Sequence, residues 1–288
     1  MAKFSSRHKE CLVYLDLDFN DARASYKRAV DFVDSNSIKY SLSSNVLSDL
    51  GGREKKSVIE LFRNDYVWSE SHPGRVQTKP QQCTRLIFTL DKESSPLACE
   101  NFMALCSGEK GLSKQSSLPL HYKGTKIHRY HKGLGIIQGG DIQFGNGTGG
   151  ESIWGKKFKD DVKGLKGKHD KLGVLSMGNG GKNSNTSQFF VCLKDTGAPV
   201  CDKKHVVFGQ LLHGEDTLQL MQKMMDDEEG GSTEEDEYNY KDAFLEEGPP
   251  IRIVITGCGE WNPASDLIQG FYDEADIFQP FAGGEKED

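Results

Sequence analysis

The sequence predicts a mainly β protein, folded as a barrel or a sandwich, and two observations lead to this prediction. First, short apolar runs recur along the chain with alternating polar residues, which is the pattern of strands that bury one face. Second, glycine is abundant, at 32 of 288 residues, and it is dense between the apolar runs of residues 127–209. Many short strands joined by tight glycine turns favour a barrel or sandwich over a parallel α/β sheet.

The amino-terminal part combines one strand with helical segments. Cys11–Phe19 is rich in β-forming residues and alternates apolar with acidic side chains, so it predicts a strand. Ala22–Val33 and Lys55–Phe62 carry apolar residues at helical spacing and predict two helices. His72–Gln82 contains two prolines and a glycine, which indicates a linker.

The remaining elements follow the linker. Thr84–Leu90 predicts a second strand, and Ser95-Pro96 opens a helix, because proline fits the first helical turn. Thr217–Met225 predicts an amphipathic helix, and Ile251–Ile255 predicts the last strand. Residues 263–288 form a polar tail in which Tyr272, Phe278 and Phe281 are candidate docking aromatics.

Composition excludes several classes of protein. The chain has 36 Lys+Arg against 43 Asp+Glu and a formal charge of -7, which argues against a nucleic-acid partner. No apolar run approaches the ~20 residues that a membrane span needs. The first residues lack the apolar stretch of a signal peptide, so we expect a cytoplasmic protein with no membrane partner.

Neither the cysteines nor the glycine runs indicate a metal or a bound phosphate. The seven cysteines are scattered and include no Cys-x-x-Cys pair, so we expect reduced, mostly buried thiols and no metal site. His128, His131 and His169 have no spacing typical of metal ligands. No glycine run follows a strand and opens a helix with Lys-Ser/Thr, as a phosphate-binding loop requires.

Several motifs occur in one order and carry the functional interpretation. They are Ile127-His-Arg129 with Gln138-Gly-Gly-Asp141, Leu175-Ser-Met-Gly-Asn179 with Ser187-Gln-Phe-Phe190, and Lys204-His-Val-Val-Phe-Gly209. From Thr84 to Trp261 the chain resembles the cyclophilins, which are peptidyl-prolyl cis-trans isomerases. The resemblance implies a closed eight-stranded antiparallel barrel capped by two helices. It also implies a prolyl isomerase that uses no cofactor and binds proline-containing peptide segments.

Such a barrel needs a strand that precedes and pairs with Thr84–Leu90. Asp65–Trp68 is close in sequence but short, and Val13–Phe19 looks more like an opening strand, so we favour the latter. The organisation is then residues 1–20 with the first strand, a mostly helical insertion in the first hairpin at 21–81, the rest of the barrel at 82–262, and the tail at 263–288. Insertions of this kind are tolerated, because loop-closure entropy rises slowly with length.

The resemblance also assigns site residues. Arg129 matches the catalytic arginine of the family, and Gln138 matches a residue that orients it and contacts the substrate. The remaining positions match residues that bind the peptide or line its proline pocket: Ile136, Gly178, Asn179, Gln188, Phe190, Val200, Cys201 and His205. The segment Gly111–Leu120 resembles a loop insertion of some cyclophilins, and Glu151 matches the glutamate that this loop contacts.

Several positions depart from the family pattern. Leu134 or Gly135 stands where the proline pocket usually has a phenylalanine, and Ile136 replaces a methionine. Val200 falls near the tryptophan that grips cyclosporin, in a loop two residues longer than usual. We therefore expect reduced catalysis and weak or no cyclosporin binding.

A second hypothesis is a binding or structural module with vestigial catalysis. The opening residues and strand, and the stretch around His121, look most like the peptidyl-prolyl isomerase-like protein 6 group. That resemblance points to the cilium or flagellum and to microtubule-associated, axonemal partners. We expect such partners to contact residues 21–81 and the tail, because the helices carry more apolar surface than two short helices can hide from each other.

Overall fold

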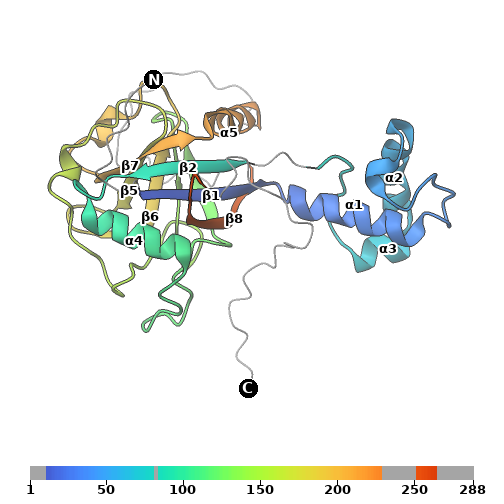
Figure 1. Ribbon diagram of the computed structural model, residues 1–288, viewed down its shortest axis with the longest axis horizontal. Coiled ribbons are helices and arrows are strands. Elements are labelled where there is room, and N and C mark those ends of the chain that lie inside the picture. The colour runs from blue at the N-terminus through green and yellow to red at the C-terminus, as the bar shows by residue number, and fades with distance from the viewer. Residues whose placement is uncertain (1–10, 81–83, 229–250, 265–288) are drawn as a thin grey trace. The chain divides into compact units, whose positions relative to one another are not determined.

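The computed structural model describes residues 11–80, 84–228 and 251–264, and in it the strands form a closed antiparallel barrel. Around the barrel the order is β1-β2-β7-β5-β6-β4-β3-β8 (Figure 1). The predicted eight-stranded barrel is therefore confirmed. The strands are β1 (Cys11–Phe19), β2 (Arg85–Leu90), β3 (Lys126–His131), β4 (Ile136–Gly139), β5 (Val174–Asn179), β6 (Asn185–Cys192), β7 (Val207–His213) and β8 (Ile253–Glu260).

Strand β1 is the opening strand that the barrel needs. It pairs antiparallel with β2, with Cys11 opposite Leu90 and Asp16 opposite Arg85. The competing hypothesis, a strand at Asp65–Trp68, is wrong. Asp65 instead precedes the short helix α3 (Tyr66–Ser71), and its Oδ1 accepts a hydrogen bond from the Trp68 backbone N–H. An N-cap aspartate satisfies a helix donor, which explains the helical start.

Two helices cover the barrel, α4 (Pro96–Ser107) and α5 (Glu215–Glu228) (Figure 1). Proline occupies the first turn of α4, as the sequence predicts, and Gly108 ends it in the left-handed conformation with φ of 70°. Helix α4 packs against β6, β7 and β8. Its Phe102 contacts three aromatic rings of the barrel core, with centroids 5.1–5.2 Å away: Tyr122, Phe189 and Phe208.

The segment between β1 and β2 is a compact unit with its own core. It contains α1 (Ala22–Asn36), the 3₁₀ turn η1 (Leu47–Asp49), α2 (Gly52–Asn64) and α3. Phe32 lies at the centre of this core and packs against Tyr40, Phe62 and Trp68 at centroid distances of 5.5–5.8 Å. The predicted excess of uncovered apolar surface is therefore only partly right. Val33, Val58 and Phe62 are buried in this core, and Tyr26, Val30 and Leu61 are half-buried against it. The most exposed apolar residues of the unit lie at other positions.

None of the helices in the described ranges is long and apolar enough to cross a membrane. The candidate docking aromatics Tyr272, Phe278 and Phe281 lie outside the described residues.

Candidate active site

The Gln-Gly-Gly-Asp motif builds the glycine-rich loop that follows β4. The buried carboxylate of Asp141 accepts hydrogen bonds from the backbone N–H groups of Gln143, Phe144 and three further residues of the loop, at donor–acceptor distances of 2.9–3.3 Å. Burial alone would raise the pKa of Asp141, but these N–H donors together lower it. Gly140 must be glycine, because its φ is 82° and an added Cβ would lie 2.5 Å from the Ser187 carbonyl oxygen.

The side-chain amide of Gln188 connects this loop to Gln138. Gln188 Nε2 donates to the carbonyl oxygens of Gly147 and Gly149 at 2.9 and 2.7 Å. Its Oε1 then faces the other way and accepts from Gln138 Nε2 at 2.6 Å. Gln138 lies opposite Arg129 in the β3–β4 pair. The loop thus fixes the amide that lies beside the predicted catalytic arginine.

The predicted residues converge on one small cavity of about 30 Å³. Eight of the ten predicted side chains or backbones line it: Arg129, Ile136, Gln138, Gly178, Asn179, Phe190, Cys201 and His205. Gly178 lets β5 approach the side chains of Gln138 and Gln188 closely. A Cβ added there would lie 3.2 Å from Gln188 Cβ and 3.3 Å from Gln138 Nε2. The arrangement places a cationic guanidinium at an otherwise largely apolar pocket.

Two predicted residues do not line this cavity. Gln188 instead contacts Gln138 through the hydrogen bond described above. Val200 is 40% exposed in the 3₁₀ turn η3 (Pro199–Cys201) and is not part of the lining, although its neighbour Cys201 is buried there. Of the two candidates for the position of the pocket phenylalanine, Leu134 lines the cavity and Gly135 is not part of the lining.

The sequence interpretation missed His131 as a member of this lining. The alternation of strand residues could have found it, because residues 129 and 131 share one face of β3. The His131 Nδ1 accepts the Leu134 N–H at 3.2 Å and so shapes the β3–β4 turn. Burial lowers the pKa of His131 to about 4, so the ring is neutral at physiological pH.

Two imidazoles hold the Phe190 ring at the floor of the cavity. His169 stacks on it with centroids 5.5 Å apart, and His205 meets it edge-on at 5.2 Å. The His205 Nδ1 lies 2.9 Å from the Met177 carbonyl oxygen, so this nitrogen carries the proton and donates it. Burial lowers the pKa of His205 to about 4, and the site keeps a neutral imidazole next to Phe190.

Behind Phe190 lies an aspartate–histidine–serine chain that resembles a nucleophilic triad but cannot serve as one. His169 Nδ1 is 3.0 Å from Asp202 Oδ1, and its Nε2 is 2.9 Å from Ser176 Oγ. Ser176 is fully buried and donates its hydroxyl to the Val206 carbonyl oxygen at 2.9 Å. A nucleophile needs access to a substrate carbonyl, so this chain is a structural network that fixes His169 against Phe190.

Glu151 joins the glycine loop to the Gly111–Leu120 segment. It is buried, and it accepts hydrogen bonds from the hydroxyls of Ser113 and Ser116, the second at 2.6 Å. Gln143 Nε2 donates to it from the loop organised by Asp141, at 3.4 Å. The contact implied by the resemblance is therefore present.

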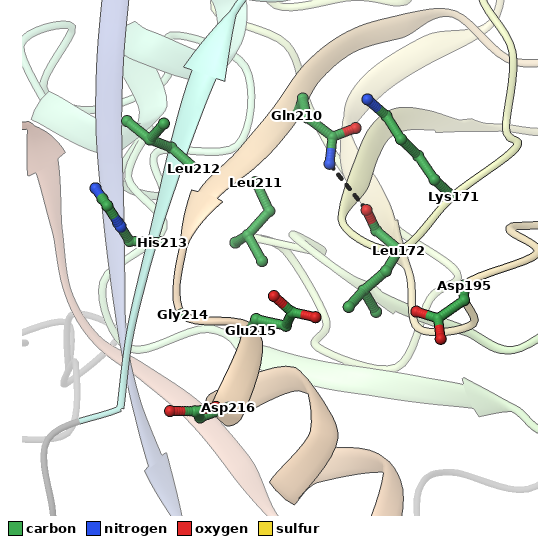
Figure 2. Close-up of a pocket in the computed structure, with 10 residues that line it drawn as sticks. All are labelled: Lys171, Leu172, Asp195, Gln210, Leu211, Leu212, His213, Gly214, Glu215 and Asp216. Atoms are coloured by element: carbon green, nitrogen blue, oxygen red, sulfur yellow. Dashed lines mark hydrogen bonds between the residues drawn. The ribbon is translucent and has the colours of Figure 1, made fainter. Parts of the chain in front are cut away.

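A more spacious cavity, of about 480 Å³, lies elsewhere on the barrel (Figure 2). It is bounded by the end of β7, the start of α5 and the turn at Lys171–Leu172, where Gln210 Nε2 donates to the Leu172 carbonyl oxygen at 2.8 Å. None of the predicted site residues lines it. Within the described ranges, no group of three histidine, cysteine or acidic residues is arranged to hold a metal ion.

Comparison with known proteins agrees with this geometry. A family model described as cyclophilin type peptidyl-prolyl cis-trans isomerase/CLD matches residues 75–245, more than half of the chain. The peptidyl-prolyl cis-trans isomerase cyp11 of Rhizopus delemar is 45% identical over 176 residues, which are 61% of this chain and 46% of that protein. The chain thus spans about half the length of the curated relative that it matches.

Proposed function

Because the chain belongs to the cyclophilin-type peptidyl-prolyl cis-trans isomerase family, we propose that it rotates X–Pro peptide bonds in proline-containing segments. The observation that carries this proposal is the shared cavity of Arg129 and Phe190, which places a cation beside an apolar floor. The reaction needs no nucleophile or cofactor, since no covalent bond is broken. It must overcome a barrier of ~18–20 kcal/mol that arises from amide resonance.

In this proposal Arg129 stabilises the twisted peptide bond. A donor directed at the prolyl nitrogen favours loss of resonance, so it binds the transition state better than the planar ground state. Arginine suits this role because its guanidinium is always charged and its donors form a rigid fork. Gln138, fixed by Gln188, contacts the substrate carbonyl, while the backbone at Gly178 and Asn179 holds the peptide in an extended form.

We propose that this activity is weaker than usual for such a site. The cavity of about 30 Å³ is about the size of one or two buried waters, so it must widen to admit a proline ring. Leu134 and Ile136 line it where an aromatic wall would offer more contact area. Ground-state and transition-state binding of the ring therefore both weaken.

The test is a protease-coupled or NMR-exchange assay on a proline peptide. Arg129→Ala should lower kcat/KM at least ~tenfold, equivalent to ~1.4 kcal/mol of transition-state stabilisation. Arg53→Ala, at an exposed arginine of α2, is the matched control and should leave the rate unchanged. Wild-type activity in Arg129→Ala, or no activity in the parent protein, would contradict the proposal.

A second proposed function, compatible with the first, is a binding module. Three apolar side chains of the helical unit are far more exposed than its core residues: Ile38 at 94%, Tyr66 at 70% and Val67 at 78%. Lys39 Nζ and Tyr40 Oη donate hydrogen bonds to Asp65 Oδ2 at 2.8 and 2.7 Å. Because Ile38 precedes Lys39, and Tyr66 and Val67 follow Asp65, these bonds bring the three exposed side chains to one region of the unit. Exposed apolar residues gathered in this way are typical of protein contact sites.

We propose that the partner is cytoskeletal, as the resemblance to the peptidyl-prolyl isomerase-like protein 6 group suggests, and that the protein acts in the cytoplasm and the ciliary axoneme. Co-sedimentation with purified microtubules tests the contact. Replacing Ile38, Tyr66 and Val67 together with serine should abolish co-sedimentation. Val46→Ser, at a residue 47% exposed in the same unit, should not change it. Equal binding by both variants would contradict the proposed surface.

A further inference from the structure

A groove of about 290 Å³ lies along α4 and shares no lining residue with the candidate active site. Its apolar lining comes from the first turn of α4 at Pro96 and from Met103 and Ala104 further along the helix. A side chain that filled it would gain apolar contact on one face of α4. The proposed isomerase activity makes no use of this groove.

The rim of the groove is acidic. Glu100, Glu109 and Glu260 contribute three carboxylates from α4, from the turn after it and from the end of β8. Among the lining residues that the structure describes, Lys92 is the one cation. The groove therefore favours a segment that combines an apolar residue with positive charge.

The chain enters the described structure at the edge of this groove. The Cys11 thiol donates to the Met103 sulfur at 3.0 Å, and Lys92 hydrogen-bonds to the same thiol. On the other side of β1, the Trp261 N–H donates to the Leu12 carbonyl oxygen at 2.9 Å, which holds the end of β8 beside the start of β1. Residues 1–10 are thus attached where three elements of the groove meet.

We infer that the groove is the docking site of the chain's own amino-terminal segment, residues 1–10. That segment reads Met-Ala-Lys-Phe-Ser-Ser-Arg-His-Lys-Glu, so it has three basic residues against one acidic residue. Its one phenylalanine, Phe4, fits the apolar lining, and its basic residues complement the acidic rim. Six residues lie between Phe4 and Cys11. The seven Cα–Cα steps span at most ~25 Å, so the ring can reach any point along α4.

Attachment favours this occupant over a separate molecule. A segment joined directly to β1 has an effective concentration in the millimolar range at the groove, with no loss of translational freedom on binding. The cavity of Figure 2 also carries carboxylates, at Asp195, Glu215 and Asp216. It extends along β7 from Gln210 to His213, which pairs with Ile87, and so away from the Leu90 end of β2, which pairs with Cys11.

Photocrosslinking in the full chain tests the inference. The photoreactive analogue p-benzoylphenylalanine replaces Phe4, the protein is irradiated at low concentration, and mass spectrometry locates the crosslink. We expect a monomeric product joined to residues 92–109. The double change Glu100→Lys and Glu260→Lys should reduce its yield at least threefold, and so should 0.5 M salt. The matched control, Asp195→Lys with Glu215→Lys, alters the other acidic cavity and should leave the yield unchanged.

The remaining outcomes overturn the inference. A crosslink to the cavity of Figure 2, to the helical unit or to the Arg129 site would place the segment elsewhere. A dimeric product would identify a second copy as the acceptor, and a yield no higher than in 8 M urea would mean that the segment does not dock. If the double lysine variant fails to fold, Glu100→Gln with Glu260→Gln gives the same test, and an unchanged yield in that folded variant also overturns the inference.

Discussion

The pair between Asp16 and Arg85 should hold the first strand in the barrel. The Arg85 Nε and Nη2 atoms lie 2.7 and 2.8 Å from the two carboxylate oxygens of Asp16, so the contact is bidentate across β1 and β2. The side chains are only 12% and 11% exposed, and the guanidinium lies 4.2 Å from the Tyr14 ring centroid. We predict that Asp16→Ala lowers the free energy of unfolding of the barrel by about 2–4 kcal/mol.

The magnitude follows from how deeply the pair is buried. An exposed ion pair contributes ~0.2–1 kcal/mol, whereas removal of one partner from a buried pair costs ~3–5 kcal/mol, because the other charge stays buried and unpaired. Nearly nine-tenths of each side chain is covered, which places Asp16 and Arg85 near the upper range. Bidentate geometry adds to the coupling, since both N–H···O bonds are charge-assisted. A double-mutant cycle with Arg85→Ala should therefore give a coupling of ~2 kcal/mol.

Urea unfolding in a Trp68→Phe background measures this change, because the remaining tryptophans, Trp154 and Trp261, both lie in the barrel unit. The control is the Lys163–Glu93 pair of the same unit, whose charged atoms lie 3.7 Å apart and whose side chains are 68% and 84% exposed. Glu93→Ala should change the unfolding free energy by no more than ~0.5 kcal/mol. The reasoning fails if the coupling of Asp16 and Arg85 is below ~0.5 kcal/mol, or if Asp16→Ala costs no more than Glu93→Ala.

Three further predictions concern pH, thiol reactivity and drug binding. Burial lowers the pKa of three barrel histidines to about 4, namely His128, His131 and His205. The unfolded chain protonates them near pH 6.5, so the urea midpoint should fall between pH 6.5 and 4, and a flat profile there would contradict this. The Cys106 thiol and the His121 ring lower the pKa of Cys258 to about 6, whereas burial raises that of Cys192 to about 12. Iodoacetamide at pH 7 should therefore label Cys258 before Cys192, and equal labelling rates for the two would refute the assignment. Cyclosporin should bind weakly, because Val200 offers neither an indole ring nor its N–H donor, and nanomolar affinity by calorimetry would show that this loop is wrongly aligned.

The sequence predicted β1, β2 and β8 individually because each carries a short-range signal, whereas the closed arrangement of eight strands came from the family resemblance. Val13–Phe19 alternates apolar and acidic residues, and in β1 both kinds are buried, since Asp16 and Asp18 also lie inside the protein. The alternation thus identified a strand correctly. It also predicted that the face with the acidic residues would be exposed to solvent, whereas that face is buried. Asp65–Trp68 was the competing candidate because it is close to Thr84 in sequence. The hydrogen bond from the Trp68 N–H to Asp65, which caps a helix there, depends on a local turn that periodicity does not reveal.

The site was predictable at the level of motifs, whereas its packing was not. Motif order identified Arg129, Gln138 and Phe190, because multi-residue patterns are specific even when single residues are not. Which of Leu134 and Gly135 faces the cavity depends on the β3–β4 turn, where Gly135 has a φ of 63° and Leu134 is left to line the pocket. A one-residue difference in a turn changes which side chain faces inward, and sequence spacing alone does not fix it.

The order of the contacts gives the glycine-rich loop a mechanical role in the site. Five backbone N–H groups converge on Asp141, and the loop that they shape presents the Gly147 and Gly149 carbonyls to one amide of Gln188. With its Nε2 committed to the loop, Gln188 can only accept at Oε1, so Gln138 must donate there through its own Nε2. The side-chain oxygen of Gln138 is then oriented indirectly by the Asp141 carboxylate, through the loop and Gln188. A buried polar network with each amide orientation determined by its neighbour is rigid because no member can turn without leaving a buried group unsatisfied. This explains why the Gln-Gly-Gly-Asp motif and the Ser-Gln-Phe-Phe motif, which are distant in sequence, act as one unit beside Arg129.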